Sequence, residues 1–226
     1  MGDIDRIAEQ FIPTRGRAWR NVVDFLKRRD RGLVADLGCG NGRHSFPAAM
    51  IGYEVVALDI SWKLIRHVLK RRRKLRLSTL HLVIGSITHI PIRDGVIDVA
   101  LVIAVLHSIP TLKLRFRALQ EVWRILKTGG KALVTVWSAF QPRHAAPLLF
   151  GLLKLLTRRL WEPFDAEVPW RAGLNYTVHR FYHLYTPCEL KYTISRSAPW
   201  IYKVGRFDVK RSVFPQNYAA IMIKIC

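Results

Sequence analysis

Short apolar runs alternate with amphipathic stretches along the first two thirds of the chain, and this alternation predicts strands connected by helices. The strands are expected just before Gly38 and at residues 53–59, 80–84, 96–104 and 131–137. Residues 43–50 are expected to open a helix after the first strand. Apolar positions at helical spacing predict another helix over residues 114–126, which Gly129 and Gly130 would end as a C-cap turn. The alternation predicts an α/β fold built on a parallel sheet.

The last third of the chain is less regular. Residues 207–213 and 218–225 predict two strands that close the sheet as an antiparallel hairpin. Residues 140–200 are aromatic, basic and interrupted by prolines, and we interpret them as an insertion that caps the active-site edge of a single domain, residues 1–226. Within it, residues 145–156 predict a helix docked over the sheet, with an amphipathic membrane helix as the alternative. No run reaches ~18 uncharged apolar residues, so no membrane span is expected.

The most informative motif is the turn after the first strand, residues 36–42, which reads D-L-G-C-G-N-G. Glycines tolerate backbone angles closed to other residues and let a ligand approach the main chain. The second strand ends in Asp59, and an acid at that position beside a glycine turn is the geometry that binds the ribose of an adenosine-bearing cofactor. The G-x-G-x-G spacing and the leading acid disfavour a diphosphate. They favour a cationic amine, such as that of S-adenosylmethionine.

Charge is the second strong signal in the sequence. The chain has 226 residues and a net charge of +21, which is unevenly distributed. Residues 1–60 hold 9 basic and 8 acidic side chains, whereas residues 61–226 hold 28 and 8. The densest basic run is residues 70–74, with Arg76 beyond it. Such an excess repels itself unless a polyanion balances it. Nucleic acid is the first candidate and an anionic membrane surface is the second.

Cysteine usage and the first residues of the chain bear on its location. The three cysteines lie far apart, so neither a disulfide framework nor a zinc-ligand spacing is present. The chain begins Met-Gly-Asp-Ile-Asp-Arg, which lacks the apolar core of a signal peptide. We therefore expect a cytoplasmic protein without a bound metal.

Further segments give the sequence a family resemblance. They are Phe11–Trp19, which contains Thr14 and Arg15, Ile103–His107, Glu167–Trp170 and His179–Tyr185. With the glycine turn, they resemble the wobble-uridine tRNA carboxymethyl methyltransferases, a family that includes the methyltransferase domain of an AlkB-type tRNA hydroxylase. The resemblance covers about residues 8–225 and is most specific in the Arg-Phe-Tyr-His-Leu-Tyr segment. It implies a Rossmann-like class I methyltransferase, with a seven-stranded, mostly parallel sheet and an antiparallel terminal hairpin. It also implies transfer of a methyl group from S-adenosylmethionine to the carboxylate of 5-carboxymethyluridine at tRNA position 34.

The resemblance assigns roles by motif position. The implied cofactor-binding residues are Asp36, Gly38, Cys39, Gly40, Gly42, Asp59, Ile60, Ser86, Ile87 and Ile103. The candidates for holding the substrate carboxylate are Arg15, His107, Arg180 and His183. Alternation along a strand places Arg180 and His183 on opposite faces, and we favour Arg180. A carboxylate is already ionised at pH 7, so the reaction needs no general base.

Some positions depart from the family pattern. Ser86 stands where an acid usually contacts the adenine, and Gly16 and Ser108 replace a tyrosine and a histidine. These departures leave open a different wobble modification or another tRNA position. A methyltransferase for a small lipid or quinone is a further alternative. A non-catalytic RNA-binding protein with the same fold is another, although the intact acids and glycines of the turn argue against it.

The resemblance also implies a protein partner. Family members are often activated by a small zinc-binding protein that pairs with the edge of the sheet. In this fold the strand at residues 80–84 is that edge, and it is unusually apolar for a free one. The alternative is a loop that covers the edge.

Overall fold

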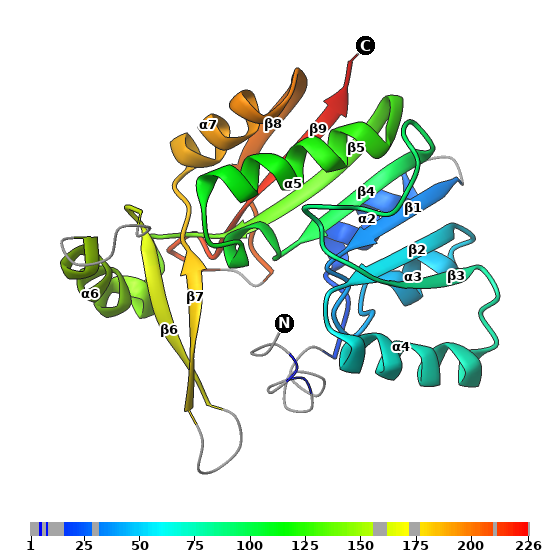
Figure 1. Cartoon of the computed structure of the whole chain (residues 1–226), viewed down its shortest axis with the longest axis horizontal. Helices are drawn as coiled ribbons and strands as arrows, with labels where there is room; N and C mark the ends of the chain where they lie inside the picture. The colour runs from blue at the N-terminus through cyan, green and yellow to red at the C-terminus, as the bar shows by residue number, and fades with distance from the viewer. Residues whose placement is uncertain are drawn as a thin grey trace.

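The computed structural model describes residues 5, 8, 16–28, 32–155, 162–171, 177–209 and 212–225 (Figure 1). The helices are α2 (Arg20–Lys27), α3 (Ser45–Met50), α4 (Trp62–Leu75), α5 (Leu112–Ile125), α6 (Ala145–Leu155) and α7 (Pro187–Ser197), with short 3-10 helices η1 (Leu106–Ser108) and η2 (Pro142–His144). The strands are β1 (Leu33–Leu37), β2 (Glu54–Asp59), β3 (Leu80–Ile84), β4 (Ile97–Ile103), β5 (Leu126–Trp137), β6 (Asp165–Arg171), β7 (Thr177–His183), β8 (Trp200–Arg206) and β9 (Asn217–Lys224).

Seven strands form one sheet in the order β3-β2-β1-β4-β5-β9-β8 (Figure 1). β1 lies parallel between β2 and β4, and β3 and β5 extend this parallel part on either side. β9 runs antiparallel to both β5 and β8. The predicted mostly parallel sheet with an antiparallel terminal hairpin is therefore confirmed. Because the parallel strands all point the same way, the turns after β1, β2 and β4 meet at one edge of the sheet.

Helices cover both faces of the sheet, which is why its central strands are apolar almost throughout. On one face, α5 and α7 pack against the sheet through buried residues such as Val122 and Leu190. On the other face, α2, α3 and α4 contribute Phe25, Phe46 and Val68 to a second apolar layer. The sheet is thus held rigidly between two layers, and its carboxyl edge is left to bind ligands.

The end of α5 differs from the prediction. The helix ends at Ile125, and Leu126 begins β5 opposite Ile97 of β4. Leu126 is fully buried, and it fills the core as a strand residue. Gly129 and Gly130 therefore do not cap the helix. They lie inside β5, next to the point where its register with β4 is irregular.

The strand predicted at residues 207–213 is wrong, because none of the described residues in this segment, 207–209 and 212–213, belongs to a strand. The edge strand is β8, in which Trp200, Tyr202 and Val204 alternate toward the core and the residues between them face outward. Phe207 is buried immediately beyond the strand, in the apolar layer on the opposite face of the sheet. An apolar residue that packs beyond the end of a strand was mistaken for the start of one.

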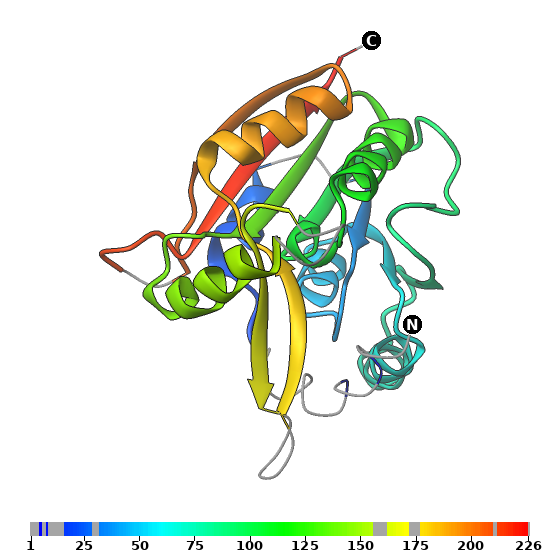
Figure 2. The same ribbon diagram turned by 60° about the vertical axis from the view of Figure 1, so that its left-hand side comes forward.

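The segment between β5 and α7 forms an added module. β6 and β7 pair as an antiparallel hairpin, and α6 packs against β6, where Lys154 forms an ion pair with Glu167. Figure 2 shows this hairpin projecting from the sheet beside α6. The two ends of the module meet, because Ser138 bridges to Tyr185 and the Tyr185 N–H donates to the carbonyl of Trp137 at 2.9 Å.

Two details of the predicted insertion change as a result. α6 docks on the hairpin and not over the main sheet. α7 packs against α5 and belongs to the main fold, so the module ends earlier than residue 200. Within the described residues, no helix combines the length and the apolar character needed to cross a membrane.

Candidate functional site

The carboxyl ends of β1, β2 and β4 surround a pocket of about 460 Å³, which β7 of the added module closes on one side. Its lining consists of Asp36, Gly38, Cys39, Gly40, Asn41, Arg43, His44, Leu58, Asp59, Ile60, Leu64, Gly85, Ser86, Ile87, Thr88, Ile103, Ala104, Val105, His107, Ser108, Ile109, Pro110, Leu114, Arg180, Phe181 and Tyr182. Residues from the main sheet and from the added module thus meet in one cavity.

The glycine turn is shaped by its backbone. Gly38 has φ +75°, and a Cβ at this position would lie 2.4 Å from a methyl carbon of Val105, so only glycine fits. The Gly38 N–H donates to the carbonyl of Leu58 at 2.7 Å, and the Gly40 N–H donates to Asp59 at 2.8 Å. These bonds tie the turn after β1 to the tip of β2.

Two buried carboxylates stand on either side of this turn. Asp36 accepts a hydrogen bond from the Ser45 hydroxyl, and burial raises its pKa to about 6 despite that bond. Burial also raises the pKa of Asp59, although the backbone N–H groups of Ser61 and Gly40 donate to it. Each carboxylate keeps lone pairs that can accept further hydrogen bonds. The pocket therefore attracts a ligand that carries both a cation and hydroxyl groups.

The structure brings most of the predicted cofactor residues together. Besides the acids and the first two glycines, Cys39, Ile60, Ser86, Ile87 and Ile103 line the pocket. The Ser86 hydroxyl lies 2.8 Å from that of Thr88, within its own turn. Gly42 does not line the pocket. It packs against the core instead, where a Cβ at this position would lie 2.8 Å from the ring of Phe46.

Two of the predicted substrate-binding residues, His107 and Arg180, line the same pocket. His107 stacks on Trp137, with 4.9 Å between ring centroids, and its Nδ1 accepts a hydrogen bond from the Trp137 N–H at 3.2 Å. That bond leaves the ring proton on Nε2. Arg180 enters from β7, and its guanidinium carbon lies 5.0 Å from the ring centroid of Tyr182. Arg15 lies outside the described residues.

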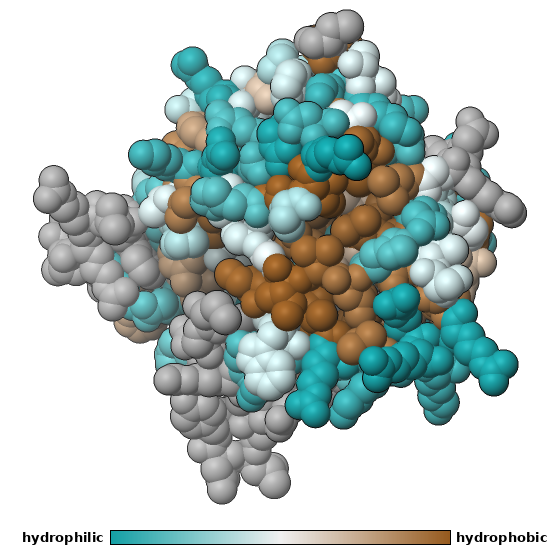
Figure 3. Space-filling view, turned by 45° about the vertical axis from the view of Figure 1, so that its right-hand side comes forward, coloured by the Kyte–Doolittle hydropathy of each residue, from teal (hydrophilic) through white to brown (hydrophobic). Residues whose placement is uncertain are grey.

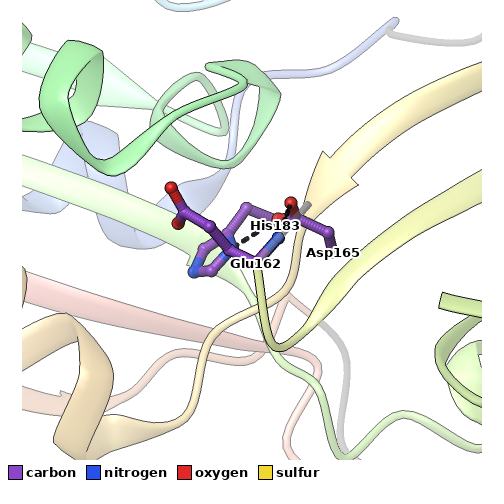
Figure 4. A group of neighbouring side chains, drawn as sticks. All are labelled: Glu162, Asp165 and His183. Carbon is purple, nitrogen blue, oxygen red and sulfur yellow. Dashed lines mark hydrogen bonds and ion pairs between the residues drawn. The ribbon is translucent and has the colours of Figure 1, made fainter. Parts of the chain in front are cut away.

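His183 does not reach the pocket. Its Nδ1 lies 2.7 Å from Asp165 (Figure 4). Its Nε2 lies 3.0 Å from Glu189, and the ring is fully buried. Burial opposes the charged ring, but the two carboxylates outweigh it and raise the pKa of His183. The predicted substrate contact of His183 is therefore wrong, because its ring is buried between Asp165 and Glu189 and does not line the pocket.

Glu162 belongs to the same cluster. One of its carboxylate oxygens lies within 4.8 Å of a carboxylate oxygen of Asp165 and of a ring nitrogen of His183 (Figure 4). Its oxygens accept hydrogen bonds from the Leu112 N–H and from the buried guanidinium of Arg115. These bonds link α5 to the residues before β6, and the contact of His183 with Glu189 links the hairpin to α7. We call Glu162, Asp165 and His183 the charged latch, because they join the added module to the main fold. Their polar atoms are already hydrogen-bonded within the protein.

Sequence reasoning missed an aromatic stack behind His107. Trp137 also stacks on His144, with 5.6 Å between ring centroids, and the guanidinium carbon of Arg143 lies 4.9 Å from the centroid of the Trp137 ring. Ala104, in the pocket wall, has φ +60°, which is rare for a residue with a Cβ. Nothing in the local pattern marks these residues, because they meet only when β5, η1 and the hairpin pack together.

Comparison with known proteins identifies the family. A model described as a methyltransferase domain matches residues 35–134. A putative methyltransferase of Encephalitozoon cuniculi is 33% identical over 186 residues, covering 80% of this chain and 77% of the relative. A tRNA (carboxymethyluridine(34)-5-O)-methyltransferase of Schizosaccharomyces pombe is 29% identical over 224 residues, covering 89% and 88%. This chain belongs to the tRNA carboxymethyluridine methyltransferase family.

The family also contains much longer proteins. The macaque tRNA (carboxymethyluridine(34)-5-O)-methyltransferase ALKBH8 is 34% identical over 142 residues, which cover 61% of this chain but only 19% of that relative. This chain therefore matches about one fifth of the length of the vertebrate relatives. Among solved structures, a methyltransferase of Methanosarcina mazei superposes with a TM-score of 0.73 at 20% identity, covering 92% of this chain and 99% of that one. At this identity the likeness establishes the fold alone.

The pocket of this family member fits S-adenosylmethionine as the cofactor. The molecule carries a cationic amine and an adenosine. The carboxylate of Asp36 matches the amine and Asp59 matches the ribose hydroxyls. Ile60, Ile87 and Ile103 provide apolar walls for a flat purine ring.

Proposed function

We propose that this enzyme methylates the carboxylate of a 5-carboxymethyl-type uridine at the wobble position of tRNA. The observation that carries the proposal is the placement of Arg180 and His107 in the same pocket as Asp36 and Asp59. The pocket thus combines a pair of acids with a cation and a ring N–H donor that arrive from different elements. The names of the S. pombe and vertebrate relatives support the same reaction.

The charges of the pocket orient two different ligands. The acids repel a substrate carboxylate and attract a cationic amine, whereas the guanidinium of Arg180 binds a carboxylate through charge-assisted hydrogen bonds. Arg180 is half-buried, so its charge is only partly screened by water. The substrate carboxylate is therefore held on the hairpin side of the pocket.

The chain's own residues have limited chemistry to perform. When bound, S-adenosylmethionine supplies an electrophilic methyl group. The carboxylate is already an anion at neutral pH, so no side chain has to remove a proton. Arg180 and His107 hold it in line for transfer, and Phe181 and Tyr182 exclude water from that side of the pocket.

The test compares Arg180→Ala with the native enzyme on carboxymethyluridine-containing tRNA, with the product nucleosides measured by mass spectrometry. Transfer should fall by at least about 100-fold, since a charged contact made at the reacting group is lost. The affinity for S-adenosylmethionine, measured by calorimetry, should stay within about threefold, because Asp36 and Asp59 remain intact. Arg196→Ala, on the exposed surface of α7, is the matched control and should retain full activity.

A normal turnover by Arg180→Ala would refute its role. If the native enzyme methylates a different tRNA nucleoside, the proposed substrate is wrong, whereas the fold and the cofactor assignment still hold. Transfer to a small lipid or quinone, with none to tRNA, would overturn the proposed function as a whole.

We also propose that a small zinc-binding protein pairs with the edge strand β3. β3 bonds to β2 along one side, and Ile84 at its end is 57% exposed. In Figure 3 an apolar patch is visible on the side of the molecule that carries β3. Co-expression with such a partner should raise solubility and cofactor affinity. A soluble, fully active protein without it would exclude this requirement. We expect the complex to act in the cytoplasm.

A further inference from the structure

The outer face of α4 carries a concentrated positive charge. Arg66, Lys70, Arg73 and Lys74 recur at the spacing of one helix face and are all exposed. We call these four residues the basic face of α4. In Figure 3 hydrophilic side chains form a band along the lower part of the molecule, at the height of α4, beside the apolar patch.

This charge is not balanced inside the protein. In the part of the chain that the structure describes, none of the ion pairs involves a basic side chain of α4. Like charges three and four residues apart repel each other on a helix surface. Burial, and then the charges of Arg71 and Lys70, lower the pKa of His67 on the same helix. No acidic partner within the described residues relieves this repulsion, which indicates a function for the basic face outside the fold.

The position of α4 connects the basic face to the pocket. The helix begins directly after the tip of β2, where the hydroxyl of Ser61 caps it by accepting a hydrogen bond from the Leu64 N–H. Ile60 and Leu64, on either side of this cap, line the pocket. From there the helix of 14 residues extends about 20 Å away from the pocket. Trp62, at the pocket end, is 42% exposed.

The pattern of α4 distinguishes nucleic acid from a membrane surface. A helix that lies on a membrane turns an apolar face outward, into the lipid. The apolar residues of α4, among them Leu64, Ile65 and Val68, are buried in the protein. Its outward face offers cations and one aromatic side chain at the end, which is the combination that binds a phosphate backbone and stacks on a base.

We propose that the basic face of α4 binds the phosphate backbone of the tRNA strand adjacent to the nucleotide in the pocket, with Trp62 stacking on a neighbouring base. This inference rests on the proposed function, because it takes the pocket nucleotide to be part of tRNA. In this arrangement α4 contributes to the affinity for tRNA and to its orientation, whereas methyl transfer takes place in the pocket.

The test neutralises three charges in the variant Arg66→Gln/Lys70→Gln/Arg73→Gln. Binding to tRNA, followed by fluorescence anisotropy at several salt concentrations, should weaken. Its log–log salt dependence should become shallower by about 2 to 3, because each phosphate contact contributes about 0.7 to 0.9. The KM for tRNA should rise while kcat at saturating tRNA stays within about twofold. Trp62→Ala should weaken binding without changing the salt dependence.

A matched control removes the same charge elsewhere. Lys191→Gln/Arg196→Gln/Lys203→Gln alters exposed residues on α7 and β8, at the opposite edge of the sheet from α4. It should leave both the affinity and the salt dependence near those of the native enzyme. Circular dichroism and S-adenosylmethionine binding verify that both triple variants are folded.

The outcomes separate this inference from the proposed function. If the native enzyme methylates tRNA but the α4 variant keeps the full salt dependence, the α4 surface is refuted and the function stands. If the salt dependence of the α4 variant becomes shallower as expected but the native enzyme methylates no tRNA, the surface is supported and the reaction is refuted. If the variant loses binding to phosphatidylserine vesicles and not to tRNA, a membrane replaces RNA as the partner and the inference is overturned.

Discussion

The substitution Gly38→Ala tests the geometry of the cofactor turn. Two costs add at this position. A Cβ at φ +75° costs about 1–2 kcal/mol. The same Cβ would lie 2.4 Å from Val105, and overpacking of this kind costs about 1–3 kcal/mol. The free energy of unfolding should therefore fall by about 2–5 kcal/mol. Cofactor binding should be severely weakened, because Val105 lines the pocket and has to move.

Gly95→Ala separates these two costs. Gly95 has φ +63°, but a Cβ there would meet nothing within 4 Å, so only the backbone cost of about 1–2 kcal/mol applies. The difference between the two variants measures the collision with Val105. In the double variant Gly38→Ala/Val105→Ala, the collision should disappear and the backbone cost should remain. A double-mutant cycle should give a favourable coupling of about 1–3 kcal/mol.

The assays are urea unfolding, followed by tryptophan fluorescence, and calorimetric titration with S-adenosylmethionine. The reasoning fails if Gly38→Ala is no more destabilising than Gly95→Ala and the cycle shows no coupling. It also fails if Gly38→Ala binds the cofactor with native affinity, since the turn would then tolerate a side chain where the structure leaves no room.

Two pH dependences follow from buried groups. Because the pKa of Asp36 is about 6, cofactor affinity measured by calorimetry should fall by up to about tenfold per pH unit below pH 6. Asp36→Asn should bind weakly without this dependence, and an equal slope in both proteins would exclude Asp36 as the group responsible. The folded-state pKa of His183 is raised, so its contribution to stability is present below the ordinary value of 6.5 and is lost as the pH rises through the folded-state pKa. His183→Gln should remove this alkaline loss in urea unfolding measured from pH 5 to 9, and a native protein no more pH-dependent than the variant would contradict the latch.

Much of the main fold could be predicted from the sequence, because it follows from local patterns. The strand at residues 80–84 was predicted with its observed bounds, and β2 and β4 differ from their predictions by a residue at one or both ends. These strands are apolar runs with clear boundaries. β8 was missed because its alternation mixes lysine and arginine with aromatic residues, and because Phe207 suggested a later start.

The residues of the candidate site were likewise predicted only where a contiguous motif marks them. The turn residues and Asp59 come from contiguous motifs, and the structure places them together. His183 was misplaced because Asp165 becomes its neighbour only when β6 pairs with β7, and because the local sequence does not show that Glu189 of α7 faces the same ring. The charged latch was likewise not foreseen, since no local pattern indicates that a histidine will be enclosed by carboxylates.

The excursion between Ser138 and Tyr185 leaves the sheet and returns to it at neighbouring positions. In topological terms it is a loop inserted at one position of the fold, because its first and last residues are joined by backbone hydrogen bonds. Its length and composition can therefore change without shifting the register of β5 or the beginning of α7. Since Arg180 is carried by this excursion, whereas Asp36 and Asp59 belong to strands of the sheet, the proposed arginine contact and the acids of the cofactor pocket lie in separate segments of the chain.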